Sequence, residues 1–456
     1  MPKESLTQTG TEVDIAKQLY GNIRGNRWVQ LAAGIVGMIV ISNFQYSFTL
    51  FTPGMKATFA DVPYPKIAMI FSLFILFETW PVPVAGYLID RFGIRKLFLI
   101  GALGISIGWI GGGFIAKSIF ELYIYYGVIA GTAAGIIYIA TVANAVKWFP
   151  DKRGLAAGCT AAGFGGGAAL TLIPISATIN ALGWQSAMGC WGIAQGVIAV
   201  GAAMILSHPP TGWKPVGWIP KQGDATQKVA QTRVEYTWQE TLKRPEFYLM
   251  YFMLMAVCFG GMMTTGNLSQ IAKSLNVYDT VILGIAVVPL TATIAGLTNA
   301  GSRIMWGFIS DRFGREYTMA FAFALEGVLI FLVTQIAGYP LLFVLLLPFV
   351  FLAWGEIYAL FSALTGDVFG PKNASANYGM LYTAKGAATM AAGYGAALVA
   401  AAYAGSFSVP YYIAAGLDIT AAIVALLVLR PLVRNRIAKE GTLPPVQEAR
   451  VGTSAA

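Results

Sequence analysis

Charged residues are scarce in this chain: Asp, Glu, Lys and Arg make up 11% of its 456 residues, whereas 57% are hydrophobic. Soluble globular proteins have about 25% charged residues. The chain therefore lacks the polar side chains that would cover a water-facing surface of its size. Its composition, with 52 glycines, is typical of helices that pack closely within a lipid bilayer.

Histidine and cysteine are also rare. His208 is the only histidine and stands beside Pro209 and Pro210 at a predicted helix end, which argues against a zinc site or a Ser-His-Asp triad. The three cysteines, Cys159, Cys190 and Cys258, lie far apart within apolar runs, which does not fit a disulfide framework. We therefore expect no metal, no cofactor and no enzymatic activity.

Apolar runs long enough to cross a bilayer recur along the chain. A transmembrane helix needs about 20 apolar residues, and one long polar stretch divides these runs into two sets of six. The sequence therefore predicts an all-α membrane protein with twelve transmembrane helices in two six-helix bundles. The predicted spans are 28–51, 67–89, 97–116, 119–146, 155–180 and 184–207, then 247–271, 279–309, 317–337, 340–368, 376–404 and 409–429. The predicted domains are a tail at 1–27, bundles at 28–207 and 247–429, a linker at 208–246 and a tail at 430–456.

Basic residues indicate how the spans are oriented. If both termini are cytoplasmic, the loops and tails on that side hold 24 of the 30 Lys and Arg residues. The opposite side holds Lys56, Lys66, Lys117 and Lys273. Cytoplasmic loops carry such an excess of Lys and Arg, so we predict that both termini are cytoplasmic. The formal net charge of +9 then requires no nucleic acid as a partner.

One motif occurs at equivalent places in the two halves: GYLIDRFGIR at 86–95 after the second span and GFISDRFGR at 307–315 after the eighth. It resembles the loop signature of the major facilitator superfamily of transporters. The resemblance implies two six-helix bundles around a central cavity and transport by alternating access. It also implies that the motif residues join the halves at a cytoplasmic gate. These are Gly86, Asp90, Arg91, Gly93, Arg95, Gly307, Asp311, Arg312, Gly314 and Arg315.

Two basic residues, Arg303 and Lys385, lie within predicted spans. A charge in the middle of a membrane helix costs about 2.5–3.5 kcal/mol on insertion scales and usually has a function. One interpretation is an ion pair with an intramembrane acid, for which Glu326, Glu356 and Asp418 are candidates. No acid clearly matches either cation at helical spacing, so we favour a second interpretation, an anion site lined by two cations without acid partners. Arginine offers a carboxylate a planar fork of donors, and lysine offers a point charge.

Polar and aromatic residues accompany these cations in mid-span. Tyr382 stands three residues before Lys385 and so shares its helix face. The others are Gln45, Tyr46, Tyr138, Trp354 and Tyr358. Each aromatic residue could instead serve packing or an interface, but interfacial aromatics gather at span ends. Their mid-span positions therefore make these six residues candidates for lining a site with Arg303 and Lys385.

Five stretches resemble the bacterial oxalate/formate antiporters, a family related to the monocarboxylate transporters. They are NFQYSFTL at 43–50, KWFPDKRG at 147–154, RxxWG from 303, WGxxYALF from 354 and NYGxxxxAK from 377. The resemblance implies that the two essential cations of that family are Arg303 and Lys385, and that the six residues above line its cavity. Three positions depart from the family pattern: Glu78 replaces glutamine, Glu356 replaces glycine and Tyr382 replaces tryptophan.

The resemblance and the intramembrane cations together predict a monomeric carrier of small carboxylate anions in the cytoplasmic membrane of a bacterium. Exchange of oxalate for formate is the leading hypothesis, because two fixed cations suit a dianion with a carboxylate at each end. Exchange is expected because closing an empty cavity around two unpaired cations would bury uncompensated charge. One alternative is a proton-coupled carrier of lactate, pyruvate or acetate, in which Glu78 or Glu356 takes the proton. Another is a membrane receptor that binds these anions without transporting them.

Overall fold

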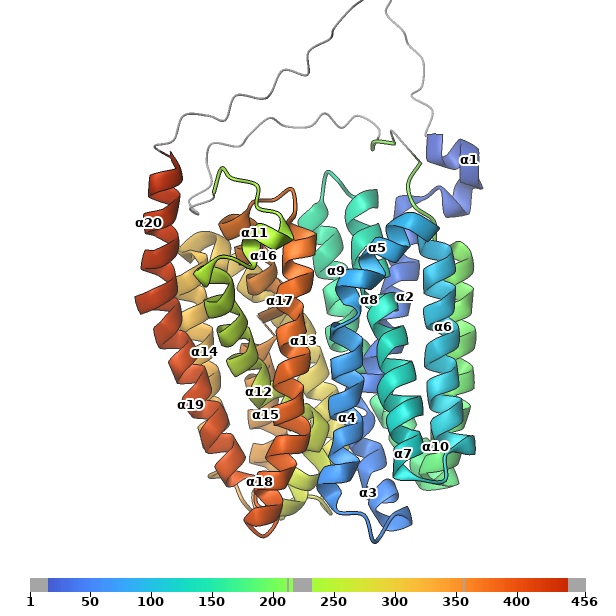
Figure 1. Ribbon diagram of the computed structural model, residues 1–456. Coiled ribbons are helices and arrows are strands. Elements are labelled where there is room, and N and C mark those ends of the chain that lie inside the picture. Colours follow the sequence, from blue (N-terminus) through green and yellow to red (C-terminus); the bar gives the residue numbers. More distant parts are fainter. Residues whose placement is uncertain (1–14, 211–212, 216–231, 356, 442–456) are drawn as a thin grey trace, which may run out of the picture.

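Helices build nearly all of the computed structural model, which describes residues 15–210, 213–215, 232–355 and 357–441. In Figure 1 the helices of the first half, coloured blue to green, lie beside those of the second half, coloured yellow to red, and most run along one common direction. Helices α1, α11 and α20 lie at one end of the molecule, and α3 and α18 lie at the other.

The first half consists of ten helices with three short irregular segments. The helices are α1 (Ile15–Arg24), α2 (Arg27–Tyr46), α3 (Phe48–Thr58), α4 (Tyr64–Thr79), α5 (Val82–Phe92), α6 (Ile94–Ile110), α7 (Ile119–Leu122), α8 (Gly131–Trp148), α9 (Arg153–Gly167) and α10 (Leu172–Ile205). The π-helical segments are η1 (Gly111–Ile115) and η2 (Tyr123–Ala130), and η3 (Ala168–Leu170) is a 3-10 turn.

The second half has the same character. Its helices are α11 (Trp238–Thr241), α12 (Pro245–Ser274), α13 (Val287–Phe313), α14 (Arg315–Val333), α15 (Pro340–Trp354), α16 (Ile357–Phe369), α17 (Ala374–Thr389), α18 (Ala396–Ala402), α19 (Ser408–Val424) and α20 (Arg430–Gly441). The π-helical segments are η4 (Met390–Gly395) and η5 (Ala425–Leu429), and the strands are β1 (Val281–Ile282) and β2 (Ile285–Ala286). The last helical run continues through α20, beyond the predicted span end at 429.

A β-hairpin replaces the start of the predicted eighth span. Val281 pairs with Ala286 and Ile282 with Ile285. The two residues between the strands, Leu283 and Gly284, both have positive φ, as a tight two-residue hairpin turn requires. The predicted beginning of this span at 279 is therefore wrong, and α13 begins at Val287. An apolar run alone cannot separate a short hairpin from the helix that follows it.

Apart from α1 and α11, the helices of the described residues form twelve passes. Eight helical segments are long and apolar enough to cross a membrane, and the bent pair α4–α5 makes nine. One of the eight, Leu155–Ile205, has 51 residues, too many for one pass at 1.5 Å per residue. It divides at Gly183, whose φ is 78°. The two passes that complete the count are α13, which contains Arg303, and α17–η4–α18, which contains Lys385.

The repeated motif has one backbone conformation in both halves. Gly93 ends α5 with φ 88° and ψ 148°, and Gly314 ends α13 with φ 95° and ψ 150°. Only glycine adopts this combination readily. In each half the next helix begins at the following residue, so the glycine reverses the chain within a single residue.

The two halves meet closely at the end where α3 and α18 lie. The hydroxyl of Ser269 on α12 donates to the backbone carbonyl of Thr49 on α3 at 2.7 Å. The hydroxyl of Tyr64 on α4 donates to Asn267 on α12 at 2.9 Å. The hydroxyl of Ser72 donates to the carbonyl of Thr389 on α17 at 2.9 Å. The halves are thus joined by hydrogen bonds on this side of the molecule.

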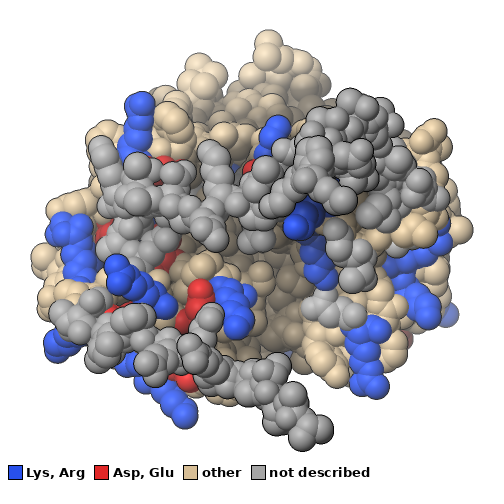
Figure 2. Space-filling model, turned by 90° about the horizontal axis from the view of Figure 1, so that it is seen from above, with Lys and Arg blue, Asp and Glu red and all other residues tan. Residues whose placement is uncertain are grey.

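Figure 2 shows the opposite end of the molecule, where α1, α11 and α20 lie. Lys and Arg side chains are distributed around this face, and fewer Asp and Glu side chains are visible. The face also contains part of the predicted linker, because the backbone N–H groups of Thr232 and Tyr236 donate to the backbone carbonyls of Asp367 and Phe369. The end of α20 joins this network through Glu440, which accepts a hydrogen bond from Tyr236 at 2.6 Å.

Candidate substrate site

Interrupted helices place the predicted site residues in the middle of the molecule. Helix α2 ends at Tyr46, next to Gln45. Helix α4 ends one residue after Glu78, and the following α5 is inclined to it by 41°. Helix α15 ends at Trp354, and α16 resumes shortly before Tyr358. Transporters often place their binding groups at such discontinuities.

The ammonium group of Lys385 is fully buried, and all three of its donors are used. Its Nζ donates to Oε2 of Glu78 at 2.8 Å, to Oε1 of Gln45 at 2.9 Å and to the hydroxyl of Tyr382 at 3.3 Å. Glu78 is 1% exposed and Lys385 0%, so they form a buried ion pair between α4 of the first half and α17 of the second.

The expectation that Lys385 has no acid partner is therefore wrong. The partner is also none of the three candidate acids, Glu326, Glu356 and Asp418. Glu78 stands 307 residues away in the sequence, and spacing along one helix carries no information about a contact between the two halves. The ion pair depends on how α4 and α17 approach each other, which Gly386 permits: a Cβ there would lie 2.3 Å from the hydroxyl of Thr79.

Arg303 differs from Lys385, because among the described residues it has neither an acid partner nor a hydrogen bond, although the neutral hydroxyl of Tyr46 lies close to it. The residue is 4% exposed, and none of Nε, Nη1 and Nη2 makes a hydrogen bond. The guanidinium lies over two aromatic rings, with Cζ 4.4 Å from the centroid of Tyr358 and 5.9 Å from that of Phe164. Cation–π contacts contribute about 2 kcal/mol when desolvated, which is less than the several kcal/mol that burying a charge costs.

The predicted aromatic residues form one connected wall beside the cations. The rings of Tyr138 and Tyr382 are stacked with centroids 5.2 Å apart. Tyr382 contacts Tyr358 at 6.2 Å, and Tyr358 contacts Trp354 at 5.4 Å. With Gln45 on Lys385 and Tyr46 nearby, the structure brings all eight predicted binding residues into one cluster.

Two further residues complete the cluster. Phe164 on α9 is buried, and its ring lies 5.2 Å from Nζ of Lys385 as well as beneath Arg303. Asn299, one turn before Arg303 on α13, donates to the hydroxyl of Tyr46 at 2.9 Å. Sequence reasoning missed both. The available signals were a single large side chain within the glycine-rich run 163–167 and an amide four residues before an intramembrane cation.

Most of the unused polar groups at this site are donors. Besides the three nitrogens of Arg303, buried atoms without a hydrogen bond are Nε2 of Gln45, Nε1 of Trp354 and the hydroxyl of Tyr358. The unused acceptors are Oε1 of Glu78 and Oδ1 of Asn299. A site with mainly donors and excess positive charge is suited to bind an anion with several oxygens.

The remaining predicted acids do not contact the two cations in the described part of the chain. Glu326 and Asp418 are both fully buried. Glu326 lies beside Gly260 on α12, and Asp418 packs against Gly327 on α14, so both belong to the interior of the second half. Glu356, proposed as a coupling acid, lies outside the described residues.

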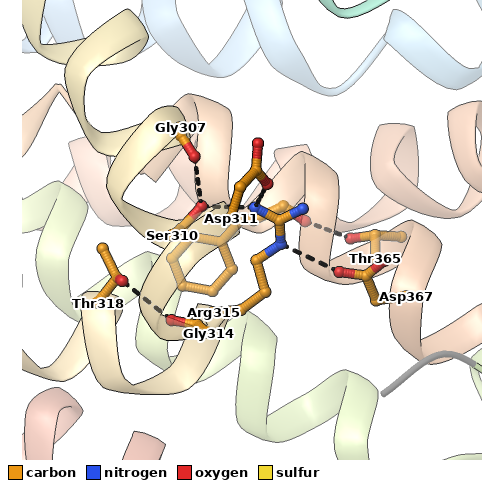
Figure 3. Close-up of polar contacts among 9 residues, drawn as sticks. Gly307, Ser310, Asp311, Gly314, Arg315, Thr318, Thr365 and Asp367 are labelled. Carbon is orange, nitrogen blue, oxygen red and sulfur yellow. Dashed lines mark hydrogen bonds and ion pairs between the residues drawn. The ribbon is translucent and has the colours of Figure 1, made fainter. Parts of the chain in front are cut away.

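The loop motif of the second half forms a compact polar cluster (Figure 3). Nε of Arg315 is 3.1 Å from Oδ2 of Asp367 on α16, and its Nη1 is 2.6 Å from Oδ1 of Asp311. Ser310 also accepts a hydrogen bond from Arg315. All these partners belong to the second half, so these two ion pairs do not join the halves as the family resemblance implied.

Contacts described for the first motif likewise stay within the first half. Arg95 donates to the carbonyl of Met204 on α10, and Arg91 contacts the hydroxyl of Tyr87 at 3.5 Å. The structure does not describe the side chain of Asp90. The gate role of the ten motif residues stays a prediction.

A cavity of about 400 Å³ lies away from the cations, next to the hydrogen bonds that close the molecule at α3. Its lining includes Asp279, Ser176 and Asn180 but no Lys or Arg. A carboxylate would gain no charge compensation there. We therefore place the candidate site at Arg303 and Lys385.

Comparison with known proteins agrees with this architecture. The sequence model of the Major Facilitator Superfamily matches residues 33–296 and 267–452. The oxalate:formate antiporter of Oxalobacter formigenes is 32% identical over 376 residues, which are 82% of this chain and 85% of that protein. Human monocarboxylate transporter 14 is 30% identical over 118 residues, 26% of this chain and 22% of that one.

A solved structure supports the fold independently of sequence. The nucleoside transporter NupG superposes with a TM-score of 0.66 over 88% of this chain and 99% of that one, at 13% identity. The predicted fold, two bundles that together make twelve passes, is thereby confirmed. The chain belongs to the major facilitator superfamily of membrane transporters and, within it, to the oxalate/formate antiporter family.

Proposed function

We propose that this protein carries a small carboxylate anion across the cytoplasmic membrane of a bacterium, by alternating exposure of the site at Arg303 and Lys385. Both termini face the cytoplasm in this proposal, because the end with α1, α11 and α20 is rich in Lys and Arg (Figure 2) and such faces are cytoplasmic. The 32% identity to an oxalate:formate antiporter supports a carboxylate substrate.

One observation carries the proposal: the buried guanidinium of Arg303 has no hydrogen bond in the described chain. A buried charge is retained only when something pairs with it. A carboxylate can accept two parallel N–H bonds from a guanidinium, so it would satisfy Arg303 in a way that water or a sugar could not. The unused donors of Gln45, Trp354 and Tyr358 can bond its remaining oxygens.

The leading mode of transport in this proposal is exchange. Closing the site around substrate leaves Arg303 compensated, whereas closing it empty buries the cation alone. An empty-carrier step that costs about 3 kcal/mol more would be more than a hundredfold slower. Substrate on the far side of the membrane would therefore accelerate uptake.

Counterflow in proteoliposomes tests the function directly. The purified protein is reconstituted, the vesicles are loaded with unlabelled formate, oxalate, lactate or pyruvate, and uptake of the labelled anion is followed. We expect transient accumulation of at least one labelled carboxylate. An Arg303→Gln variant is the control and should show none. Absence of accumulation for every anion with the parental protein would overturn the proposal.

A further inference from the structure

The charges at the site are not those of a simple pair of cations. Among the described residues the cluster contains two positive groups, Arg303 and Lys385, and one negative group, Glu78. With all three ionised, its formal charge is therefore +1. A carboxylate bound between the cations would meet one uncompensated positive charge instead of two.

We infer that Glu78 sets the substrate charge of this carrier, so that the site accepts a monoanionic carboxylate in preference to a dianion. This inference rests on the proposed function. Glu78 stands where the antiporter pattern has glutamine, and the substrate class that it selects is small monocarboxylates.

Hydrogen bonding at Lys385 supports the assignment. The ammonium already donates to Glu78, Gln45 and Tyr382, so an incoming oxygen must replace one of them. The contact to Tyr382 is the longest, at 3.3 Å, and Tyr382 is neutral. An oxygen that replaces Tyr382 leaves the 2.8 Å ion pair with Glu78 intact. The free fork of Arg303 would bind the same carboxylate from the other side.

The closed site then distinguishes anions by charge. A monoanion brings the cluster to neutrality, whereas a dianion leaves one buried negative charge. The second carboxylate of a dianion can stay close to the carboxylate of Glu78. Alternatively it can displace Glu78 from Lys385, which leaves the Glu78 carboxylate buried without a cation. Charges about 4 Å apart repel by about 4 kcal/mol at an effective dielectric constant of 20, and burial prevents screening by salt.

Oxamate and oxalate provide a matched pair of probes. They share a planar two-carbon frame, but oxamate has an amide in place of one carboxylate and therefore one negative charge instead of two at pH 7. Binding of each to the purified protein in detergent is measured by titration calorimetry at pH 7. We expect the parental protein to bind oxamate at least about tenfold more tightly than oxalate.

Variants separate the charge of Glu78 from its other effects. In Glu78→Gln the ratio of the two dissociation constants should move at least tenfold toward oxalate, because the site charge rises to +2. Glu78→Asp keeps the charge and should keep the preference for oxamate. Glu326→Gln is the control, because it removes an equally buried carboxylate that does not contact Lys385, and it should leave the ratio unchanged.

Three results would overturn the inference: tighter parental binding of oxalate than oxamate, an unchanged ratio in Glu78→Gln, or a preference for oxalate in Glu78→Asp. If Glu78→Gln cannot be purified, the ratios of the oxamate and oxalate dissociation constants for the parental protein and for Glu78→Asp test the inference. Failure of the proposed function has a different signature, because it is the absence of counterflow for every carboxylate. Counterflow with an unchanged ratio would refute only the role of Glu78.

Discussion

Lys385→Gln should destabilise the protein unless Glu78 is neutralised with it. The two charged groups are 2.8 Å apart and almost completely buried, and removing one partner of a buried pair costs about 3–5 kcal/mol. We therefore expect a loss of about 3–4 kcal/mol, in the lower part of this range.

The assay is heat denaturation of the detergent-solubilised protein at pH 7, followed by tryptophan fluorescence. At about 2–4 °C per kcal/mol for a large domain, Lys385→Gln should melt about 6–15 °C below the parental protein. The double variant Glu78→Gln with Lys385→Gln should recover most of this loss, since two amides can hydrogen-bond without charge.

Two outcomes would refute this reasoning. One is a Lys385→Gln variant that melts within about 2 °C of the parental protein, which would mean that the ion pair contributes little. The other is a double variant no more stable than the single one, because the coupling between the two sites would then be absent.

Three further predictions concern transport and the loop motif. Arg303→Lys should reduce counterflow at least about tenfold, because an ammonium cannot reproduce a two-pronged contact; a parental rate would show that charge alone suffices. Vesicles preloaded with substrate should take up label faster than empty ones at clamped membrane potential, and equal rates would exclude exchange. The ratio of the two uptake rates should be larger in Glu78→Gln, where both cations lack an acid. Asp367→Asn should cost about 1–2 kcal/mol, whereas Asp311→Asn should cost under about 0.5 kcal/mol, because the side chain of Asp367 is 7% exposed and that of Asp311 is 66% exposed. Equal melting temperatures for these two variants would contradict the burial argument.

Local sequence properties were sufficient for the class of protein and much of its architecture. Hydropathy predicts most spans because burial in lipid imposes the same apolar requirement on every helix, whatever its neighbours. The repeated motif predicted equivalent turns in the two halves, and Gly93 and Gly314 adopt the same conformation. Arg303 and Lys385 were recognisable because a charge inside a span is rare.

The tertiary structure decided what these charged residues contact. The pairing of Lys385 with Glu78, the place of Phe164 beneath both cations and the bond from Asn299 to Tyr46 all join helices distant in sequence. Each depends on how closely the helices of the two halves approach, and that distance is set by small residues along the whole interface. Sequence periodicity reports which face of a helix is apolar, but not which helix it meets. The sequence therefore determined that charges lie in the membrane, and only the packing of the two halves determined which of them is left for a substrate.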